Sequence, residues 1–239
     1  MDEQKLLIEC QNLSSKIEVH SGTNALGKIN AISSMYYIYF NNFKEFKKHL
    51  GSFCSEESAL TLRDKKFADQ QILEASRLQH NLLAGIKSLV ENERWLIKKW
   101  YSGHVFEGKH KKKIDELFIS PEIPKFLEEF RNYFLHQSFP PCAFQVIRES
   151  NIIFSRFVIY RDDLLSSGWK WSGKSKQFIK NQSDEFEIIE IFKQYHLSIL
   201  KFYHWLEISI KDIHKNEINE VRRMTAELKG MYRTLGYDV

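Results

Sequence analysis

Residues 59–101 read ALTLRDKKFADQQILEASRLQHNLLAGIKSLVENERWLIKKWY, and this stretch decides the fold class. Large apolar residues recur along it at near-helical spacing, which predicts one long amphipathic helix. Gly85 is its weak point, and Ser102-Gly103 is typical of a helix end. The apolar positions are Phe67, Ile72, Leu78, Leu82, Ile86, Leu89 and Leu96.

Helical patterns extend over most of the remaining chain. We expect further helices over residues 2–20, 25–50, 109–120, 121–139 and 184–234, with a break at 21–24, a loop at 51–58 and another break near His214. Only 10 Gly and 4 Pro occur in 239 residues, which favours long helices over a β-sandwich. The sequence therefore predicts a mainly α-helical bundle, with one domain over residues 1–239.

Two short segments depart from the helical pattern. FQVIRES (144–150) and IIFSRFVIY (152–160) are rich in β-branched and aromatic residues, and polar turn residues lie between them. Such a pair of segments is typical of a β-hairpin. We expect the hairpin, together with a mixed segment that continues to residue 183, to form an insertion over residues 144–183 of the helical domain.

Composition and charge restrict the class of protein. The net charge is +4, which permits an anionic partner without requiring one. The three cysteines lie far apart and show no metal-ligand spacing, so we expect free thiols in a reducing compartment. The N-terminus lacks a signal-peptide pattern, and no apolar run is long enough for a membrane span. We expect a cytoplasmic protein without a metal, a cofactor or membrane contact.

The most informative functional stretch is RNYFLH, from Arg131 to His136. Ser120-Pro121-Glu122 predicts the start of its helix, since Ser caps, Pro fits the first position and Glu suits the helix dipole. Pro140-Pro141 must end this helix shortly after His136. The motif is therefore expected near the C-terminal end of a helix.

The residue types of the motif suit RNA cleavage without a metal ion. His136 can transfer a proton near neutral pH, and Arg131 offers a fork of donors to phosphate oxygens. Asn132 can orient either group. On a regular helix Asn132 and His136 share a face, whereas Arg131 points about 100° away from Asn132, so its long side chain must reach round.

RNYFLH resembles the signature of HEPN domains, in which an Arg and a His are separated by four to six residues. Four residues intervene here, and Asn132 holds the position after the Arg, which is often polar. The surrounding EEFRNYFLHQSFPP is similar to an uncharacterised bacterial group of HEPN-like proteins, a wider likeness that extends over about residues 60–210. The resemblance implies an all-α bundle, a homodimer and a metal-independent endoribonuclease. It further implies a toxin or phage-defence role, with an antitoxin or defence-system protein as partner.

Other interpretations of the same residues remain open. Arg131 could pair with Glu128 on the surface, and His136 could favour the helix end as a cation. The HEPN family also contains inactive binding or regulatory modules, which form the alternative function. A third interpretation is a helical structural protein in which the motif is accidental.

Two further segments could contact nucleic acid. KHKKK at 109–113 contributes Lys109, Lys111, Lys112 and Lys113 as candidate RNA-binding residues, or forms a solvated helix start. The segment from Trp169 to Lys180 interleaves Trp and Lys, which suits stacking on single-stranded bases or, alternatively, anchoring of a loop on the core. The His residues of the C-terminal helix lack the spacing of a metal site.

Overall fold

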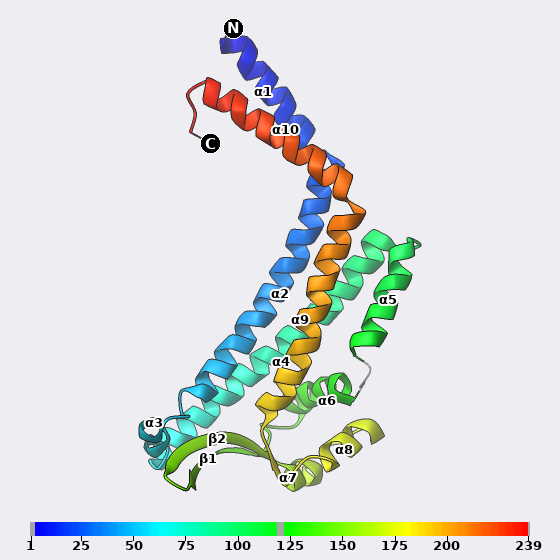
Figure 1. Cartoon of the computed structure of the whole chain (residues 1–239). Helices are drawn as coiled ribbons and strands as arrows, with labels where there is room; N and C mark the ends of the chain where they lie inside the picture. The colour runs from blue at the N-terminus through cyan, green and yellow to red at the C-terminus, as the bar shows by residue number, and fades with distance from the viewer. Residues whose placement is uncertain (1–2, 119–121, 239) are drawn as a thin grey trace. The chain divides into compact units, whose positions relative to one another are not determined.

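The computed structural model describes residues 3–118 and 122–238 (Figure 1). Over these ranges the chain is mainly helical with a β-hairpin insertion, as expected. In chain order the elements are α1 Glu3–Glu18, α2 Ser21–Gly51, α3 Glu56–Thr61, α4 Lys65–Tyr101, α5 Val105–Leu117, α6 Glu122–His136, β1 Cys142–Glu149, β2 Ile152–Tyr160, α7 Arg161–Ser166, α8 Gly173–Lys180, β3 Glu185–Phe186, α9 Ile188–Ile213 and α10 Lys215–Thr234.

The chain divides into two compact units. Unit 1 comprises residues 1–34 and 203–239, and unit 2 comprises residues 35–202. The boundaries fall inside α2 and α9, so each of these helices contributes to both units. The expectation of a single domain over residues 1–239 stays a prediction.

Unit 1 is built on the packing of α1 against α10. Leu6 and Cys10 are buried on α1, and Val221 is buried on α10. The start of α2 also lies very close to α10, because a Cβ at Gly22 would overlap the backbone carbonyl of Glu217. Glycine at this position therefore permits a close approach of the two helices.

Unit 2 has a core of interlocking aromatic rings between α2, α9 and the hairpin. The His196 ring of α9 stacks on Phe43 of α2 with 4.3 Å between centroids, and the Tyr39 hydroxyl lies 3.1 Å from its Nδ1. Phe46 contacts Phe192 edge to face. These contacts fix the C-terminal part of α2 along α9, in agreement with the apolar periodicity of both segments.

The β-hairpin is confirmed. β1 and β2 pair antiparallel, from Cys142 opposite Ile159 to Glu149 opposite Ile152, around a two-residue turn. Ser150 in this turn has φ of 55°. The hairpin packs against α3, α4 and α7. It lies at the same end of unit 2 as α8 (Figure 1).

The residues that follow the hairpin contain a feature that the periodicity did not predict. Glu185–Phe186 forms a third strand that pairs antiparallel with β2, so α9 begins at Ile188 rather than at residue 184. Asp184 does not start the helix, and its carboxylate lies 2.8 Å from Nη2 of Arg161. Backbone pairing with the edge of β2 has overridden the helical pattern expected from residue 184.

The long stretch at 59–101 is two helices rather than one. α3 ends at Thr61 and α4 begins at Lys65, where Asp64 accepts a hydrogen bond from Phe67 N at 2.8 Å. An Asp cap satisfies one free N–H of the new helix, which explains the interruption. Gly85 does not interrupt α4. It lies where α4 closely approaches Asn42 of α2.

Two other helix starts differ from the expected positions for the same reason. α2 begins at Ser21 rather than 25, and His20 Nδ1 accepts from Gly22 N at 3.0 Å. α5 begins at Val105 rather than 109, and His104 Nδ1 accepts from Phe106 N at 3.1 Å. Histidine acts as the cap in both cases. The expected break near His214 is confirmed, since it separates α9 from α10.

None of the described helices is long and apolar enough to cross a membrane. Cys10, Cys54 and Cys142 are free thiols.

Candidate functional site

α6, which carries the motif, is held in place by its apolar face. Phe126, Phe130 and Tyr133 are buried along one side of the helix. Trp171, from the segment before α8, stacks on Tyr133 with 5.7 Å between ring centroids. The expected cap residues Ser120 and Pro121 lie outside the described residues, and Glu122 is the first residue of the helix.

His136 is the last residue of α6, as the prolines predicted. The final helical bond runs from Gln137 N to Tyr133 O at 2.9 Å, after which the chain leaves the helix. The side chain of His136 is exposed, and within residues 3–118 and 122–238 it has no hydrogen bond or ion pair. An exposed imidazole at a helix end is accessible to a substrate.

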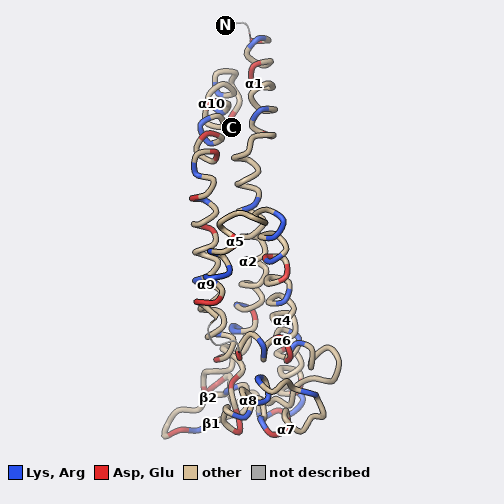
Figure 2. Tube along the Cα trace, turned by 90° about the vertical axis from the view of Figure 1, so that its right-hand side faces the viewer, with Lys and Arg blue, Asp and Glu red and all other residues tan. Residues whose placement is uncertain are grey.

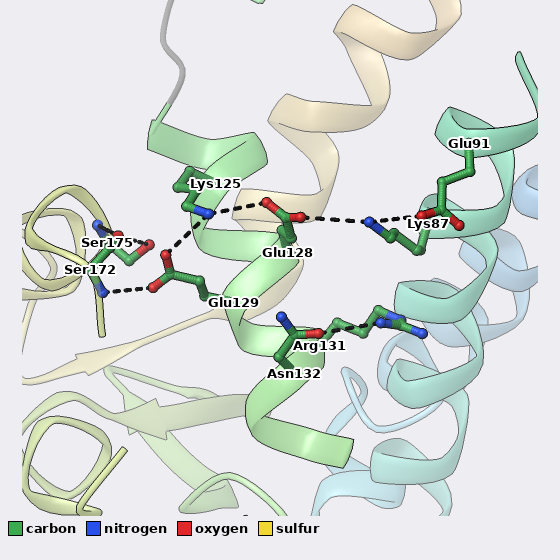
Figure 3. A network of polar contacts seen from close by, with 9 residues as sticks. All are labelled: Lys87, Glu91, Lys125, Glu128, Glu129, Arg131, Asn132, Ser172 and Ser175. Carbon is green, nitrogen blue, oxygen red and sulfur yellow. Dashed lines mark hydrogen bonds and ion pairs between the residues drawn. The ribbon is translucent and has the colours of Figure 1, made fainter. Parts of the chain in front are cut away.

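Arg131 and Asn132 are brought together by the structure. Arg131 Nη1 donates to Asn132 Oδ1 at 3.3 Å, and both side chains are half-buried. Figure 3 shows the Arg131 side chain extending away from Asn132 toward α4. The 100° between the two positions is therefore bridged by the length of the arginine, without any loosening of the helix.

The surroundings of Arg131 lie in the contact between α6 and α4. One turn before it, Glu128 lies 3.6 Å from Lys87 of α4, and three residues after it, Phe134 contacts the ring of His80. The Nε atom of Arg131 is buried without a hydrogen-bond partner among the described residues. The guanidinium is therefore shielded at its base, while Nη1 is held by Asn132.

Glu128 is not the partner of Arg131. It binds Lys125 at 3.2 Å as well as Lys87 (Figure 3). Burial alone would raise the pKa of Glu128, but the two lysines outweigh burial and lower it. The surface pair suggested as a structural role for Arg131 is therefore absent from the described residues.

The neighbouring Glu129 has a purely structural task. Its Oε2 accepts from Ser172 N at 2.9 Å, and its Oε1 lies 3.4 Å from Lys125. Burial opposes ionisation of Glu129, but the hydrogen bonds from Ser172 and Ser175 give a net lowering of its pKa. This carboxylate ties α6 to the start of α8.

The basic cluster at 109–113 is not a single five-residue surface. Lys109, Lys111 and Lys112 are exposed, and Lys113 lies 2.8 Å from Glu116. His110 points inward, where its Nε2 is hydrogen-bonded to Oε1 of the buried Glu93 of α4. The cluster also lies inside α5 rather than at its start.

The Trp-Lys segment has the anchoring role that was the alternative to base stacking. Trp171 is buried, and its Nε1 donates to Leu164 O at 3.3 Å. Trp169 contacts Tyr133 edge to face, and its Nε1 is buried. Trp171 is thus held in the core and Trp169 is half-buried against it, whereas Lys170 and the lysines of α8 are exposed.

No group of three His, Cys, Asp or Glu side chains that could hold a metal ion occurs among the described residues. The Nδ1 atom of His196 is hydrogen-bonded to the Tyr39 hydroxyl, and its ring stacks on Phe40 and Phe43 of α2.

The sequence interpretation missed Trp95 of α4, a residue that is 57% exposed. Lys99 Nζ lies 4.5 Å from the centre of this ring. A signal was present in the sequence, because Trp95 lies about 100° round the helix from Leu96 and about 120° from Leu89, outside the apolar face.

No protein-family model, curated protein or solved structure matches this chain. Its similarity to HEPN domains therefore stays a prediction based on the motif.

Proposed function

We propose that the chain is a metal-independent endoribonuclease of the HEPN type, acting in the cytoplasm as a toxin or phage-defence effector. The observation that supports this best is the hydrogen bond from Arg131 to Asn132, one helical turn before the exposed His136. A guanidinium and a solvent-accessible imidazole near the end of the same helix would supply charge stabilisation and proton transfer, respectively.

In the proposed reaction, His136 accepts the proton of a ribose 2′-OH, and the 2′-oxygen attacks the adjacent phosphorus. Arg131 stabilises the negative charge that develops on the phosphate oxygens, and Asn132 keeps the guanidinium oriented. The 5′-oxygen of the next nucleotide leaves and needs a proton. One chain supplies a single His at this position, so we propose that a second copy, in a homodimer, supplies the other.

The first test is growth and RNA integrity in cells after induced expression of the wild-type chain. We expect growth arrest and RNA cleavage, with a loss of about 10²–10⁴-fold in cleavage rate for His136→Ala, the range for removal of a general acid or base. Arg131→Ala should lose activity as well. Leu135→Ala is the matched control, because Leu135 is 44% exposed on the same turn and should retain activity.

Purified protein gives a second test of the same proposal. Cleavage should continue in excess EDTA, because no metal takes part, and the chain should migrate at the mass of a dimer. Undiminished cleavage by folded Arg131→Ala and His136→Ala variants would contradict the assignment of these residues. An antitoxin or defence-system partner would be sought by pull-down in either case.

The alternative function is an inactive HEPN-like binding or regulatory module. The observation that favours it is the buried Nε of Arg131, which limits how far the guanidinium can move toward a substrate. If expression of the wild-type chain leaves growth and RNA unchanged, and purified protein cleaves no RNA, this alternative is preferred.

A further inference from the structure

One side of the helix pair α2 and α9 is covered by other helices of unit 2. The ring contacts between α2 and α9 show that the two helices run antiparallel here (Figure 1). On the covered side, Asn42 Nδ2 of α2 donates to Asn81 O of α4 at 3.4 Å. The Phe202 ring of α9 meets the His110 ring of α5 with 5.5 Å between centroids. α4 and α5 therefore lie against the same side of the pair.

The opposite side of the pair carries large apolar residues that are exposed. Tyr37 of α2 is 64% exposed, and Leu197 and Leu200 of α9 are 56% and 45% exposed. At about 100° per residue, Tyr37 lies about 140° round α2 from Asn42. Leu197 and Leu200 lie about 140° and 160° round α9 from Phe202. All three side chains thus point away from the side that α4 and α5 cover.

A stack of rings joins α2 and α9 next to these exposed residues. The Phe40 ring of α2 stacks on the His196 ring of α9 with 5.7 Å between centroids, and both residues are half-buried. Tyr37 lies three residues before Phe40 on the same face of α2. Leu197 follows His196 directly, and Leu200 follows it by one turn. We call the surface formed by Tyr37, Phe40, Leu197 and Leu200 the α2–α9 face.

Three exposed lysines border the α2–α9 face. Lys44 Nζ lies 5.6 Å from the centre of the Phe40 ring. Lys47 is close enough to His196 that its charge, after burial, contributes to lowering the pKa of His196. Lys201 follows Leu200 directly (Figure 2 shows Lys and Arg of α2 and α9 in blue). Among the described residues, no acidic side chain forms an ion pair with any of the three.

Helix stability does not account for these cations. The helix dipole favours cations in the last turn, and in α2 that turn contains Lys48 and His49. Lys44 lies about two turns before the end of α2, and Lys201 lies in the middle of α9. Neither has an acidic residue three or four positions away. Lys44 instead has Lys47 and Lys48 at these spacings, which is unfavourable within the helix.

The combination of side chains decides which partner fits the α2–α9 face. A second copy packed face to face would bring Lys44, Lys47 and Lys201 against the same three lysines, which like-charge repulsion disfavours. Single-stranded nucleic acid binds by stacking on rings, and Leu197 and Leu200 offer none. An amphipathic helix with acidic flanks matches both properties, because its apolar residues cover the leucines and rings while its carboxylates meet the lysines.

We propose that the α2–α9 face binds an acidic amphipathic helix of a partner protein. From Tyr37 to Lys47 the face extends over about 15 Å of α2, at about 1.5 Å per residue. A partner helix of about three turns therefore covers it. The exposed apolar residues gather around one ring stack, which is typical of an interaction site rather than of scattered surface residues. The proposal is independent of the cleavage proposed for Arg131 and His136 of α6.

The test is fluorescence anisotropy of a labelled synthetic peptide with the full chain. The peptide has 14 residues, with leucines at helical positions i, i+3, i+4, i+7 and i+11 and glutamates at the positions that flank them. A second peptide has lysine in place of every glutamate. We expect the acidic peptide to bind and the basic peptide to bind about 10-fold more weakly or not at all, because the lysines of the face repel it.

The apolar contact is tested by Leu197→Ala/Leu200→Ala. This double variant should weaken binding of the acidic peptide about 10- to 100-fold, the range for truncation of two side chains in an interface. Leu73→Ala/Leu135→Ala is the matched control, because Leu73 and Leu135 are 58% and 44% exposed on α4 and α6. It should bind like wild type. All four leucines are exposed, so both variants should keep the far-ultraviolet circular dichroism of wild type.

The charge contribution is tested by reversing it. Replacement of all three lysines of the face by glutamate should invert the preference, so that the basic peptide binds more tightly than the acidic one. The matched control makes the same change at three exposed lysines of α8 and should keep the preference of wild type. The variant is Lys44→Glu/Lys47→Glu/Lys201→Glu, and the control is Lys174→Glu/Lys176→Glu/Lys180→Glu.

Four results would overturn the proposal. The first is no binding of the acidic peptide by wild type, and the second is an equal loss in Leu73→Ala/Leu135→Ala. The third is a lower mass of Leu197→Ala/Leu200→Ala than of wild type in sedimentation, which would assign the face to a second copy. The fourth is loss of oligo-U RNA binding, but not of peptide binding, in that variant, which would assign the face to nucleic acid. Failure of RNA cleavage in cells would leave the peptide result unaffected.

Discussion

The buried pair of Glu93 and His110 should be strongly coupled in stability. Glu93 is 3% exposed and His110 is 7% exposed. Their side chains are hydrogen-bonded to each other. Replacing either one by Leu leaves a buried polar group without its partner. Replacing both by Leu removes both polar groups and keeps an apolar contact between α4 and α5.

The expected magnitudes follow from this burial. A buried group that loses its partner costs about 1–3 kcal/mol, and about 3–5 kcal/mol where the pair is ionic. We expect Glu93→Leu and His110→Leu each to lower the free energy of unfolding by about 2–4 kcal/mol. The double variant should lose less than about 2 kcal/mol, since apolar replacement of a whole buried pair is often neutral. The coupling between the two sites should therefore exceed about 2 kcal/mol.

Urea unfolding followed by circular dichroism measures these free energies, and amide exchange in α5 shows whether the loss is local. Glu91→Leu is the matched control on the same helix. The Glu91 side chain also forms an ion pair, 3.0 Å from Lys87, but it is 59% exposed. It should change stability by less than about 0.5 kcal/mol. Additive losses in the double variant, or a single variant as stable as wild type, would refute the reasoning.

Three further predictions follow from local geometry. Gly22→Ala should destabilise unit 1 by about 1–3 kcal/mol in urea unfolding, because the new Cβ overlaps α10. The control Gly27→Ala places a Cβ with nothing within 4 Å and should stabilise the chain by up to about 1 kcal/mol. Changes of the same sign in both variants would contradict the close packing of α2 and α10 at Gly22. Burial raises the pKa of the Cys142 thiol to about 11. Alkylation with iodoacetamide at pH 8, followed by mass spectrometry, should therefore label the exposed Cys54 first. Cys142 should react about 100-fold more slowly than an unburied thiol. Burial and the charge of a nearby lysine lower the pKa of His196. The unfolded chain therefore binds more protons just below pH 6.5, so the free energy of unfolding should fall as the pH falls through that value. His196→Phe should weaken this pH dependence, and a free energy of unfolding that does not change with pH in the parent chain would disprove it.

Much of the fold could be predicted because its causes are local. The apolar periodicity of α4 and α9 and the β-branched runs of the hairpin depend on side chains within a few residues of each other. The helix end at His136 follows from Pro140-Pro141 in the same way. The errors at helix starts have a local cause as well, since Asp64, His20 and His104 are caps that the periodicity alone did not take into account.

Other features depend on residues that are distant in the sequence. β3 forms because Glu185 and Phe186 reach the free edge of β2. No pattern within these two residues predicts the pairing. The basic cluster was visible, but the inward direction of His110 depends on Glu93, 17 residues earlier. For the candidate catalytic residues, the motif was readable in the sequence, whereas the burial of the Arg131 Nε atom depends on the elements packed around α6.

The sequence by itself therefore determined the helical class, the hairpin and the identity of the motif residues, because periodicity and propensity act over a few residues. Tertiary structure alone decided which tryptophans are available to a partner. Trp169 and Trp171 lie among lysines in the sequence but are held against Tyr133. In contrast, Trp95 lies near the C-terminal end of α4, the longest of the described helices, and is exposed. Burial is a property of the elements that pack against a residue, and those elements come from elsewhere in the chain.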